Sequence, residues 1–343
     1  RAAGHHPVRD QELRDALLDP VVEGDLVLPL EAPLADDRLR LLVGHRGAQV
    51  GRSERLRRGG RAPYALMIRR AVEPSRPTVV VALVTPFRDD GTVDLEVLAE
   101  HVEFLVTAGV DGLMPCGTTG EGPLLEDDET ATVIAAVVER AGGRASVLAH
   151  VGRPATASTV ALARRAIANG ADAVSAVVPY YYALGDAQVA AHYRALLAAA
   201  GDVPVLAYTI PERTGNDLAP AVAAALADEG LAGVKDSTKS FERHREYLAL
   251  AQPGFAVYMG SDGMVLDALQ AGAAGCVSAL ANVRPDLLVR LRDAVAAGRD
   301  DEAAALQAKL SSLRQEARGP AGVKRSLAAR LDGYPAALRG PLG

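Results

Sequence analysis

The sequence predicts an α/β fold, a (β/α)8 TIM barrel with C-terminal helices and an unassigned N-terminal extension. From Thr78 onward, β-branched apolar runs of 5–8 residues alternate with Ala/Leu-rich segments whose apolar positions lie three and four residues apart. This alternation is typical of parallel strands joined by helices. It occurs eight times, which is the number of strand and helix units in such a barrel. Glycines and polar residues follow most of the runs, at the strand ends where these barrels carry their chemistry.

Each of the eight apolar runs is a predicted strand, and each is followed by a predicted helix. The strands are Val79–Pro86, Gly112–Cys116, Ser146–Val151, Ala173–Pro179, Pro204–Thr209, Leu231–Lys235, Ala256–Gly260 and Gly275–Ala279. The helices are Asp94–Ala108, Asp127–Ala141, Ala157–Asn169, Asp186–Ala200, Ala219–Asp228, Ser240–Ala251, Asp262–Ala271 and Pro285–Ala297.

Three regions are predicted along the chain. Residues 77–299 form the barrel, and residues 300–343 form a helical segment that packs outside it, with helices at Asp300–Ala317 and Val323–Arg330. Residues 1–76 differ in character, because alternating apolar runs are followed by the arginine-rich stretch Gly51–Gly60. This extension of unknown function is either a small β-containing appendage or a loosely ordered segment.

Composition argues against several classes of function. The chain has 343 residues, 49% of them hydrophobic, so it can bury a large core. Its net charge of −6 and the lack of long charged blocks predict neither nucleic acid nor a membrane as a partner. The two cysteines, Cys116 and Cys276, are too few for a disulfide framework and predict buried thiols in a cytoplasmic protein. The seven histidines lack metal-ligand spacing, so no metal is expected.

Lysine is rare in this chain, and one lysine ends an apolar run. Only four of the 37 Lys and Arg residues are lysines, and Lys235 lies in a predicted strand. A buried ammonium can lose its proton and attack a carbonyl, whereas a guanidinium stays protonated. Lys235 is therefore a candidate Schiff-base residue. The alternative is a strand-end lysine that reaches water or pairs with Asp236.

Other candidate residues follow neighbouring predicted strands. In Gly117–Gly122, backbone N–H groups and the hydroxyls of Thr118 and Thr119 can face an anion, and a carboxylate suits the loop better than a pyrophosphate. The phenol of Tyr208 can transfer protons, and Arg213 can bind a second carboxylate. The alternatives are a glycine-rich connector, a core tyrosine and a solvent-facing arginine.

Four motifs together resemble those of one enzyme family. They are Gly117-Thr-Thr-Gly-Glu121, Tyr208-Thr-Ile-Pro-Glu-Arg-Thr-Gly215, Gly233-Val-Lys-Asp236 and Tyr258-Met-Gly-Ser-Asp262. Their order and approximate spacing are similar to those of the dihydrodipicolinate synthase/N-acetylneuraminate lyase family, from Thr78 to the C-terminus. The resemblance implies a class I aldolase-type lyase that forms a Schiff base with pyruvate and needs no cofactor.

The resemblance also implies how pyruvate is bound. Lys235 would form the imine with pyruvate, or with a substrate that yields pyruvate. Thr119 and Gly120 would hold the pyruvate carboxylate, and the backbones of Gly260 and Val277 would line the pocket.

Proton transfer and assembly are implied in the same way. Tyr208 would be the proton donor and acceptor, and Thr118 would link it to Tyr181. Because Tyr181 would reach in from a second subunit, the resemblance implies a homodimer or homotetramer.

Two enzymatic functions and one binding function remain open at this point. Arg213 resembles the arginine of the synthase branch, which binds the carboxylate of aspartate semialdehyde and makes 4-hydroxy-tetrahydrodipicolinate for lysine biosynthesis. The first alternative is an aldolase or dehydratase of a 2-keto-3-deoxy sugar acid. The second is a non-catalytic homologue that binds pyruvate.

Overall fold

The structure, a computed structural model, describes residues 76–343, and its centre is a closed barrel of eight parallel strands. The strands pair in chain order, and β1 closes the barrel by pairing with β8. They are β1 (Thr78–Ala82), β2 (Gly112–Met114), β3 (Ser146–His150), β4 (Ala173–Val177), β5 (Val205–Thr209), β6 (Gly233–Asp236), β7 (Ala256–Met259) and β8 (Gly275–Ser278). The predicted (β/α)8 barrel is confirmed. The appendage predicted for residues 1–76 falls outside the described residues, apart from Arg76.

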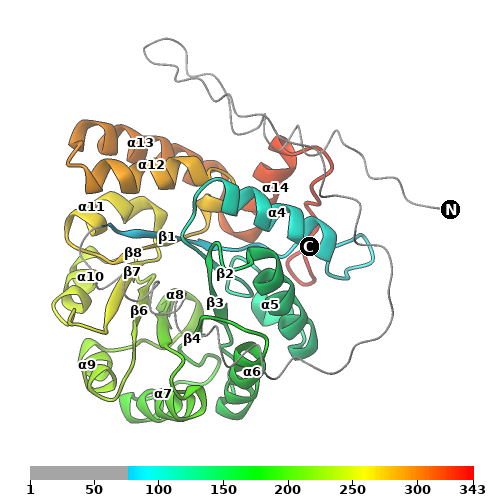
Figure 1. Cartoon of the computed structure of the whole chain (residues 1–343). Helices are drawn as coiled ribbons and strands as arrows, with labels where there is room; N and C mark the ends of the chain where they lie inside the picture. Colours follow the sequence, from blue (N-terminus) through cyan, green and yellow to red (C-terminus); the bar gives the residue numbers. More distant parts are fainter. Residues whose placement is uncertain (1–75) are drawn as a thin grey trace.

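Helices surround the strands, as Figure 1 shows. The long helices after the first seven strands are α4 (Leu95–Thr107), α5 (Asp127–Ala141), α6 (Thr156–Ala168), α7 (Asp186–Ala200), α9 (Pro220–Asp228), α10 (Phe241–Leu248) and α11 (Val265–Gln270). The short helix α8 (Pro211–Thr214) precedes α9, and α12 (Pro285–Ala296) follows β8. Two further helices, α13 (Asp300–Glu316) and α14 (Gly319–Arg330), follow the barrel.

Local sequence signals account for several helix ends. Asp94 caps α4, because its carboxylate accepts hydrogen bonds from the backbone N–H groups of Glu96 and Val97, each at 3.1 Å. Helices α9 and α12 each begin with a proline, whose missing N–H is not needed at that position. Gly142 ends α5 in the left-handed conformation that glycine adopts readily.

Some elements differ from the predicted ranges. β1 ends at Ala82 instead of Pro86, because the N–H of Val84 donates to the side chain of Asn282 rather than to a neighbouring strand. Helix α8 lies between the predicted strand Pro204–Thr209 and the predicted helix Ala219–Asp228, where no helix was expected. Helix α14 begins at Gly319 instead of Val323, since Pro320 is tolerated in a first helical turn.

The strands divide their side chains between two cores. On β5, Leu206 and Tyr208 belong to the cluster inside the barrel, whereas Val205 and Ala207 pack with the surrounding helices. The same alternation turns Lys235 of β6 inward. Because parallel pairing places it between Tyr208 and Tyr258, the lysine has aromatic neighbours on both adjacent strands.

The C-terminal helices return to the carboxyl ends of the strands. Helix α13 packs against α12, on the outside of the barrel (Figure 1). Gln307 of α13 accepts from the N–H of Leu266 and donates to the carbonyl of Asp262, both at 3.0 Å. The middle of α13 therefore lies close to the loop after β7.

Two sequence predictions concern the chain as a whole. No helix within residues 76–343 is long and apolar enough to cross a membrane. Cys116 and Cys276 are both buried and unpaired, as predicted. Burial raises the pKa of Cys116 to about 12, so this thiol keeps its proton at neutral pH.

Candidate active site

Lys235 points into the barrel near the carboxyl end of β6. Its side chain is only 4% exposed, and its Nζ lies 4.0 Å from the centre of the Tyr208 ring. The same nitrogen lies 3.7 Å from the sulfur of Met114. No ion pair among residues 76–343 involves Lys235. The ammonium is therefore held by an aromatic face and a thioether rather than by a carboxylate.

Asp236 is not a partner of Lys235, which contradicts the alternative reading from sequence. Successive strand residues point to opposite faces, so Asp236 faces the helices. Its carboxylate lies 2.9 Å from Nδ1 of His244 and accepts the N–H of Thr238 at 2.8 Å. This anion is thus bound on the outer side of the strand.

Tyr208 and Thr118 form a polar pair beside the lysine. Their hydroxyl oxygens are 3.1 Å apart, within hydrogen-bond distance, and either group can donate. Tyr208 is buried, whereas Thr118 lies in the loop after β2 and is partly exposed. A proton can therefore pass between the buried phenol and the more open loop.

His150 is the last residue of β3 and lies beside Tyr208. Its ring makes an edge contact with Tyr208, with centroids 5.8 Å apart. Burial, reinforced by the charges of Lys235 and Arg153, lowers the pKa of His150 to about 3. A neutral imidazole therefore lies beside Tyr208 at physiological pH. Sequence reasoning missed His150, although its position at a strand end was an available signal.

A cavity of about 470 Å³ extends from Lys235 to the surface. It is lined by strand ends and the loops after them, including Thr118, Thr119, Tyr208, Lys235, Gly260 and Val277. A side chain at position 260 would not fit, because its Cβ would lie 2.1 Å from the Ser237 hydroxyl. Glycine thus lets the end of β7 approach β6 and leaves room above the lysine.

The mouth of the cavity carries an excess of positive charge. Arg213, Lys239, Arg314 and Arg318 contribute cations, and Glu212 and Asp262 contribute carboxyl groups. Lys239 forms an ion pair with Glu212. Burial raises the pKa of Asp262, which favours its neutral form. Arg314 and Arg318 escaped the sequence analysis, because only the packing of α13 brings them to the barrel mouth.

Two sequence candidates lie outside the cavity. Tyr181 is 85% exposed and has a left-handed backbone, with φ of 84°. Its neighbour Tyr182 is 73% exposed, and the two rings meet edge to face. Gly120 is packed against β1, where its carbonyl accepts the hydroxyl of Thr85 at 2.7 Å. Within the single chain, neither Tyr181 nor Gly120 joins the residues around Lys235.

Metal ligands do not gather at this site. Within residues 76–343, no three His, Cys, Asp or Glu side chains are arranged to hold an ion. The reactive groups that the fold brings together are an amine, a phenol and hydroxyls, which are suited to covalent chemistry on a carbonyl compound.

Comparison with known proteins gives the class of the site. The dihydrodipicolinate synthetase family matches residues 76–342. An uncharacterized DapA-like lyase of Halobacterium salinarum is 44% identical over 269 residues, which cover 77% of this chain and 87% of the lyase. The 4-hydroxy-tetrahydrodipicolinate synthase of Methylococcus capsulatus is 39% identical, over 69% of this chain and 81% of the synthase. The crystal structure of dihydrodipicolinate synthase from Aquifex aeolicus matches with a TM-score of 0.73 and 32% identity, covering 78% of this chain and 92% of the other.

The fold and these comparisons agree. The chain belongs to the dihydrodipicolinate synthetase family, a family of pyruvate aldolases and synthases. It is a lyase of the class I aldolase type. The family resemblance found in the sequence is therefore confirmed.

Proposed function

We propose that the protein condenses pyruvate with an anionic aldehyde such as aspartate semialdehyde, through an imine at Lys235. The observation that carries this proposal is the buried Nζ of Lys235, which faces a cavity without a carboxylate partner and lies beside Tyr208. Such an amine is available to attack a carbonyl carbon. The synthases among the relatives support this reaction over others of the family.

In the proposed reaction, the groups around the lysine act one after another. Nζ of Lys235 attacks C2 of pyruvate, and the carbonyl oxygen leaves as water once it is protonated. Loss of a proton from C3 gives an enamine, whose carbon attacks the aldehyde carbon while the aldehyde oxygen gains a proton. Tyr208 is the proton donor and acceptor, and Thr118 exchanges protons with it. Attack on C2 by water, or by the amino group that aspartate semialdehyde carries, then breaks the C2–Nζ bond, so the product leaves and the free amine of Lys235 is restored.

The carboxylate of pyruvate is assigned to the loop after β2. Thr119 lines the cavity from this loop. Gly120 contributes through its backbone, which is fixed by Thr85. Gly260 and Val277 border the opposite side and leave the space that pyruvate occupies.

The charge of the mouth supports an anionic second substrate. Arg213, Arg314 and Arg318 line it, and none of them forms a salt bridge within the described part of the chain. An aldehyde with a carboxylate at its far end places that charge near these guanidinium groups, which bind carboxylates bidentately. This is the substrate type of the synthase branch, so we assign the protein to lysine biosynthesis.

The assembly is proposed to be a homodimer or a pair of such dimers. Tyr181 and Tyr182 supply aromatic area of the kind found at interfaces. Their loop is anchored, since the Asn216 amide donates to the carbonyls of Pro179 and Tyr182, each at 2.8 Å. Tyr181 of one subunit would then complete the proton path of the other. Sedimentation should show no stable monomer at micromolar concentration.

A substrate panel tests the proposed reaction. Pyruvate consumption should be fastest with aspartate semialdehyde and slow with uncharged aldehydes of similar length. Faster cleavage or dehydration of 2-keto-3-deoxy sugar acids would replace the synthase function by the aldolase or dehydratase alternative. A folded protein that binds pyruvate but turns over none of these compounds would be a non-catalytic homologue.

A further inference from the structure

A buried ionic cluster joins the C-terminal segment to the loop that contains Thr118 and Thr119. Lys324 of α14 is completely buried, and its Nζ lies 2.6 Å from the carboxylate of Glu121. The same ammonium donates to the carbonyl of Ala337 at 2.7 Å. The lysine therefore connects α14, the tail after it and the loop after β2.

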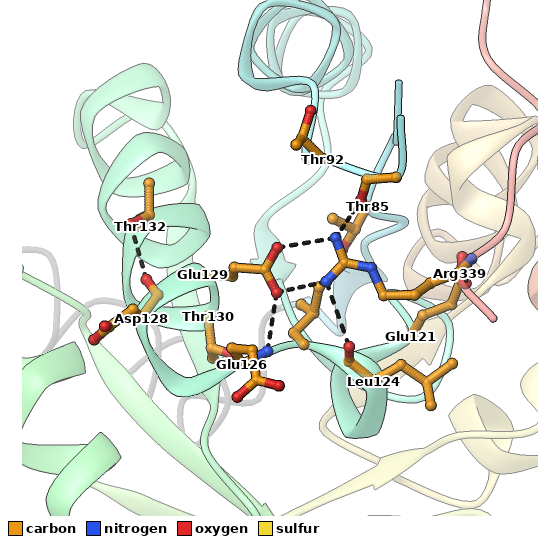
Figure 2. Close-up of polar contacts among 12 residues, drawn as sticks. Thr85, Thr92, Glu121, Leu124, Glu126, Asp128, Glu129, Thr130, Thr132 and Arg339 are labelled. Carbon is orange, nitrogen blue, oxygen red and sulfur yellow. Dashed lines mark hydrogen bonds and ion pairs between the residues drawn. The ribbon is translucent and has the colours of Figure 1, made fainter. Parts of the chain in front are cut away.

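Arg339, in that tail, contacts the same region. Its backbone N–H donates to the second carboxylate oxygen of Glu121 at 2.9 Å. Its guanidinium donates to Glu129 at 2.5 and 2.9 Å, to the carbonyl of Leu124 at 3.4 Å and to the carbonyl of Gly91. Figure 2 shows the guanidinium between Glu129 and Leu124, with Glu121 beside the arginine backbone. One side chain thus ties the loops after β1 and β2 together.

The ring of Phe87 contacts both cations. Nζ of Lys324 lies 4.1 Å from the ring centre, and the guanidinium carbon of Arg339 lies 4.6 Å from it. Both contacts are cation–π interactions. Phe87 belongs to the loop after β1 and Glu121 to the loop after β2, so the C-terminal cations contact both loops at the barrel mouth.

Glu121 is linked directly to the substrate loop. Its backbone N–H donates to the carbonyl of Thr118 at 3.2 Å, while the Thr118 hydroxyl faces Tyr208. Both Glu121 and Cys116 have left-handed backbones, with φ of 56° and 61°. Non-glycine residues hold this conformation only where their surroundings impose it, and such positions gather at ligand sites. The contacts to Lys324 and Arg339 are what hold Glu121.

We propose that Glu121, Lys324 and Arg339 are positioning residues that set the geometry of Thr118 and Thr119 for pyruvate. The C-terminal segment is then part of the active site, although none of these three residues lines the cavity. The kinetic part of this inference rests on the proposed function. The structural part, that the cluster orders residues 117–125, does not.

The kinetic test replaces Lys324 by methionine, which keeps the length and removes the charge. A loop displaced by even 1 Å weakens substrate alignment, so KM for pyruvate should rise at least about tenfold, with a smaller change in kcat. KM for the aldehyde should change much less, because Arg213 and Arg314 lie on α8 and α13, outside both α14 and the loop after β2. An unchanged KM for pyruvate in a folded variant would overturn the proposal.

A second buried ion pair provides a matched control. Arg292 of α12 pairs with Asp111 at 2.5 Å, and both side chains are buried. Asp111 accepts the N–H of Val79 at the start of β1, so this pair lies at the opposite end of the barrel. Arg292→Met should lower the melting temperature as Lys324→Met does, yet leave KM for pyruvate within twofold of the wild type. An equal rise in KM in both variants would show a general loss of stability and overturn the proposal.

Hydrogen exchange tests the structural part without any turnover. Amides of residues 117–125 should exchange faster in Lys324→Met and in Arg339→Ala, but not in Arg292→Met. Arg339→Ala keeps the Lys324–Glu121 pair, so it decides the matter if Lys324→Met does not fold. Unchanged exchange in Arg339→Ala would overturn the inference. If the wild type fails to act on pyruvate, the proposed function falls, but the exchange result still decides the role of the cluster.

Discussion

Two of the four lysines of this chain are buried, and their surroundings differ in one respect. Lys235 and Lys324 are 4% and 0% exposed, and each ammonium lies about 4 Å from the centre of an aromatic ring. Lys324 also has the carboxylate of Glu121 and the carbonyl of Ala337. Lys235 has the thioether of Met114 instead, and it faces a cavity.

The comparison shows that burial alone does not make a lysine reactive. An ammonium that is buried with its counter-ion is part of the structure, and removing it leaves an uncompensated charge. An ammonium that is buried without a counter-ion can be replaced at little cost to folding, but its amine is available for chemistry. The two lysines should therefore respond to the same substitution in opposite ways.

The largest effect is expected for Lys235→Met. The variant should lose turnover by at least about 10⁴-fold, some 5 kcal/mol of transition-state stabilisation, since no other amine reaches the cavity floor. Its free energy of unfolding should change by about 1 kcal/mol or less, because no carboxylate loses a partner. Steady-state kinetics and urea unfolding measure the two quantities. A strongly destabilised variant would mean that Lys235 is structural, like Lys324.

Lys324→Met should mainly lose stability, and its turnover should fall far less than that of Lys235→Met. Glu121 would remain buried without its partner, which costs about 3–5 kcal/mol of folding free energy. The double variant with Glu121→Gln should recover part of this loss, because the unpaired charge is removed as well. Urea unfolding of the two single variants and the double variant checks this. Additive losses would show that the two side chains act independently.

Tyr208→Phe should have the next largest effect. This effect should be on turnover at Lys235 and not on the Lys324 cluster. Removing a proton donor and acceptor typically lowers kcat by about 10²-fold or more, near 3 kcal/mol, while the ring that contacts the ammonium is kept. Imine formation should slow, yet pyruvate should still bind. Rapid-mixing kinetics separate the two steps. A variant with full turnover would remove Tyr208 from the proton path.

The smallest expected effect is a loss of folding stability at low pH. It comes from two buried histidines, one beside the reactive groups and one beside the C-terminal tail. His150 contacts Tyr208, and His101 of α4 contacts Tyr334 in the C-terminal tail. Burial lowers the pKa of His101 to about 4 and, with Lys235, that of His150 to about 3. The unfolded chain therefore binds more protons than the folded one from about pH 6.5 downward, so stability falls as the pH falls.

At pH 5, each of these histidines should cost about 2 kcal/mol of the stability present at pH 7. Replacing either by glutamine should reduce that loss, which urea unfolding at the two pH values measures. A stability that stays level between pH 7 and pH 5 would mean that both imidazoles are protonated in the fold.

The fold could be predicted because each barrel unit carries its own signals. Period-2 and period-3.6 patterns alternate from Thr78 to Ala297, and residues such as Asp94 and Gly142 cap the helices between the strands. The predicted ends of elements were wrong where a residue far away in the sequence determines the local structure. Asn282 ends β1 by accepting the N–H of Val84, and the two are 198 positions apart in the chain.

The residues around the reactive lysine could be predicted for the same reason. The residues that the C-terminal segment brings to the site could not. Tyr208 and Lys235 lie near the carboxyl ends of β5 and β6, and Thr118 lies in the loop after β2, so their convergence follows from the barrel. Arg314, Arg318 and the Lys324–Glu121 pair depend on how the C-terminal helices fold back over the mouth, which no local pattern encodes. The exposed position of Tyr181 likewise has no explanation within one chain.

Reductive trapping tests the central claim most directly. The protein is incubated with pyruvate and borohydride, digested and analysed by mass spectrometry for all four lysines. The account predicts a reduced pyruvyl adduct on Lys235 and none on Lys324, because Lys235 faces the cavity without a counter-ion, whereas Lys324 is buried against Glu121. An unmodified Lys235 in folded protein, or an adduct on Lys324 instead, would contradict it.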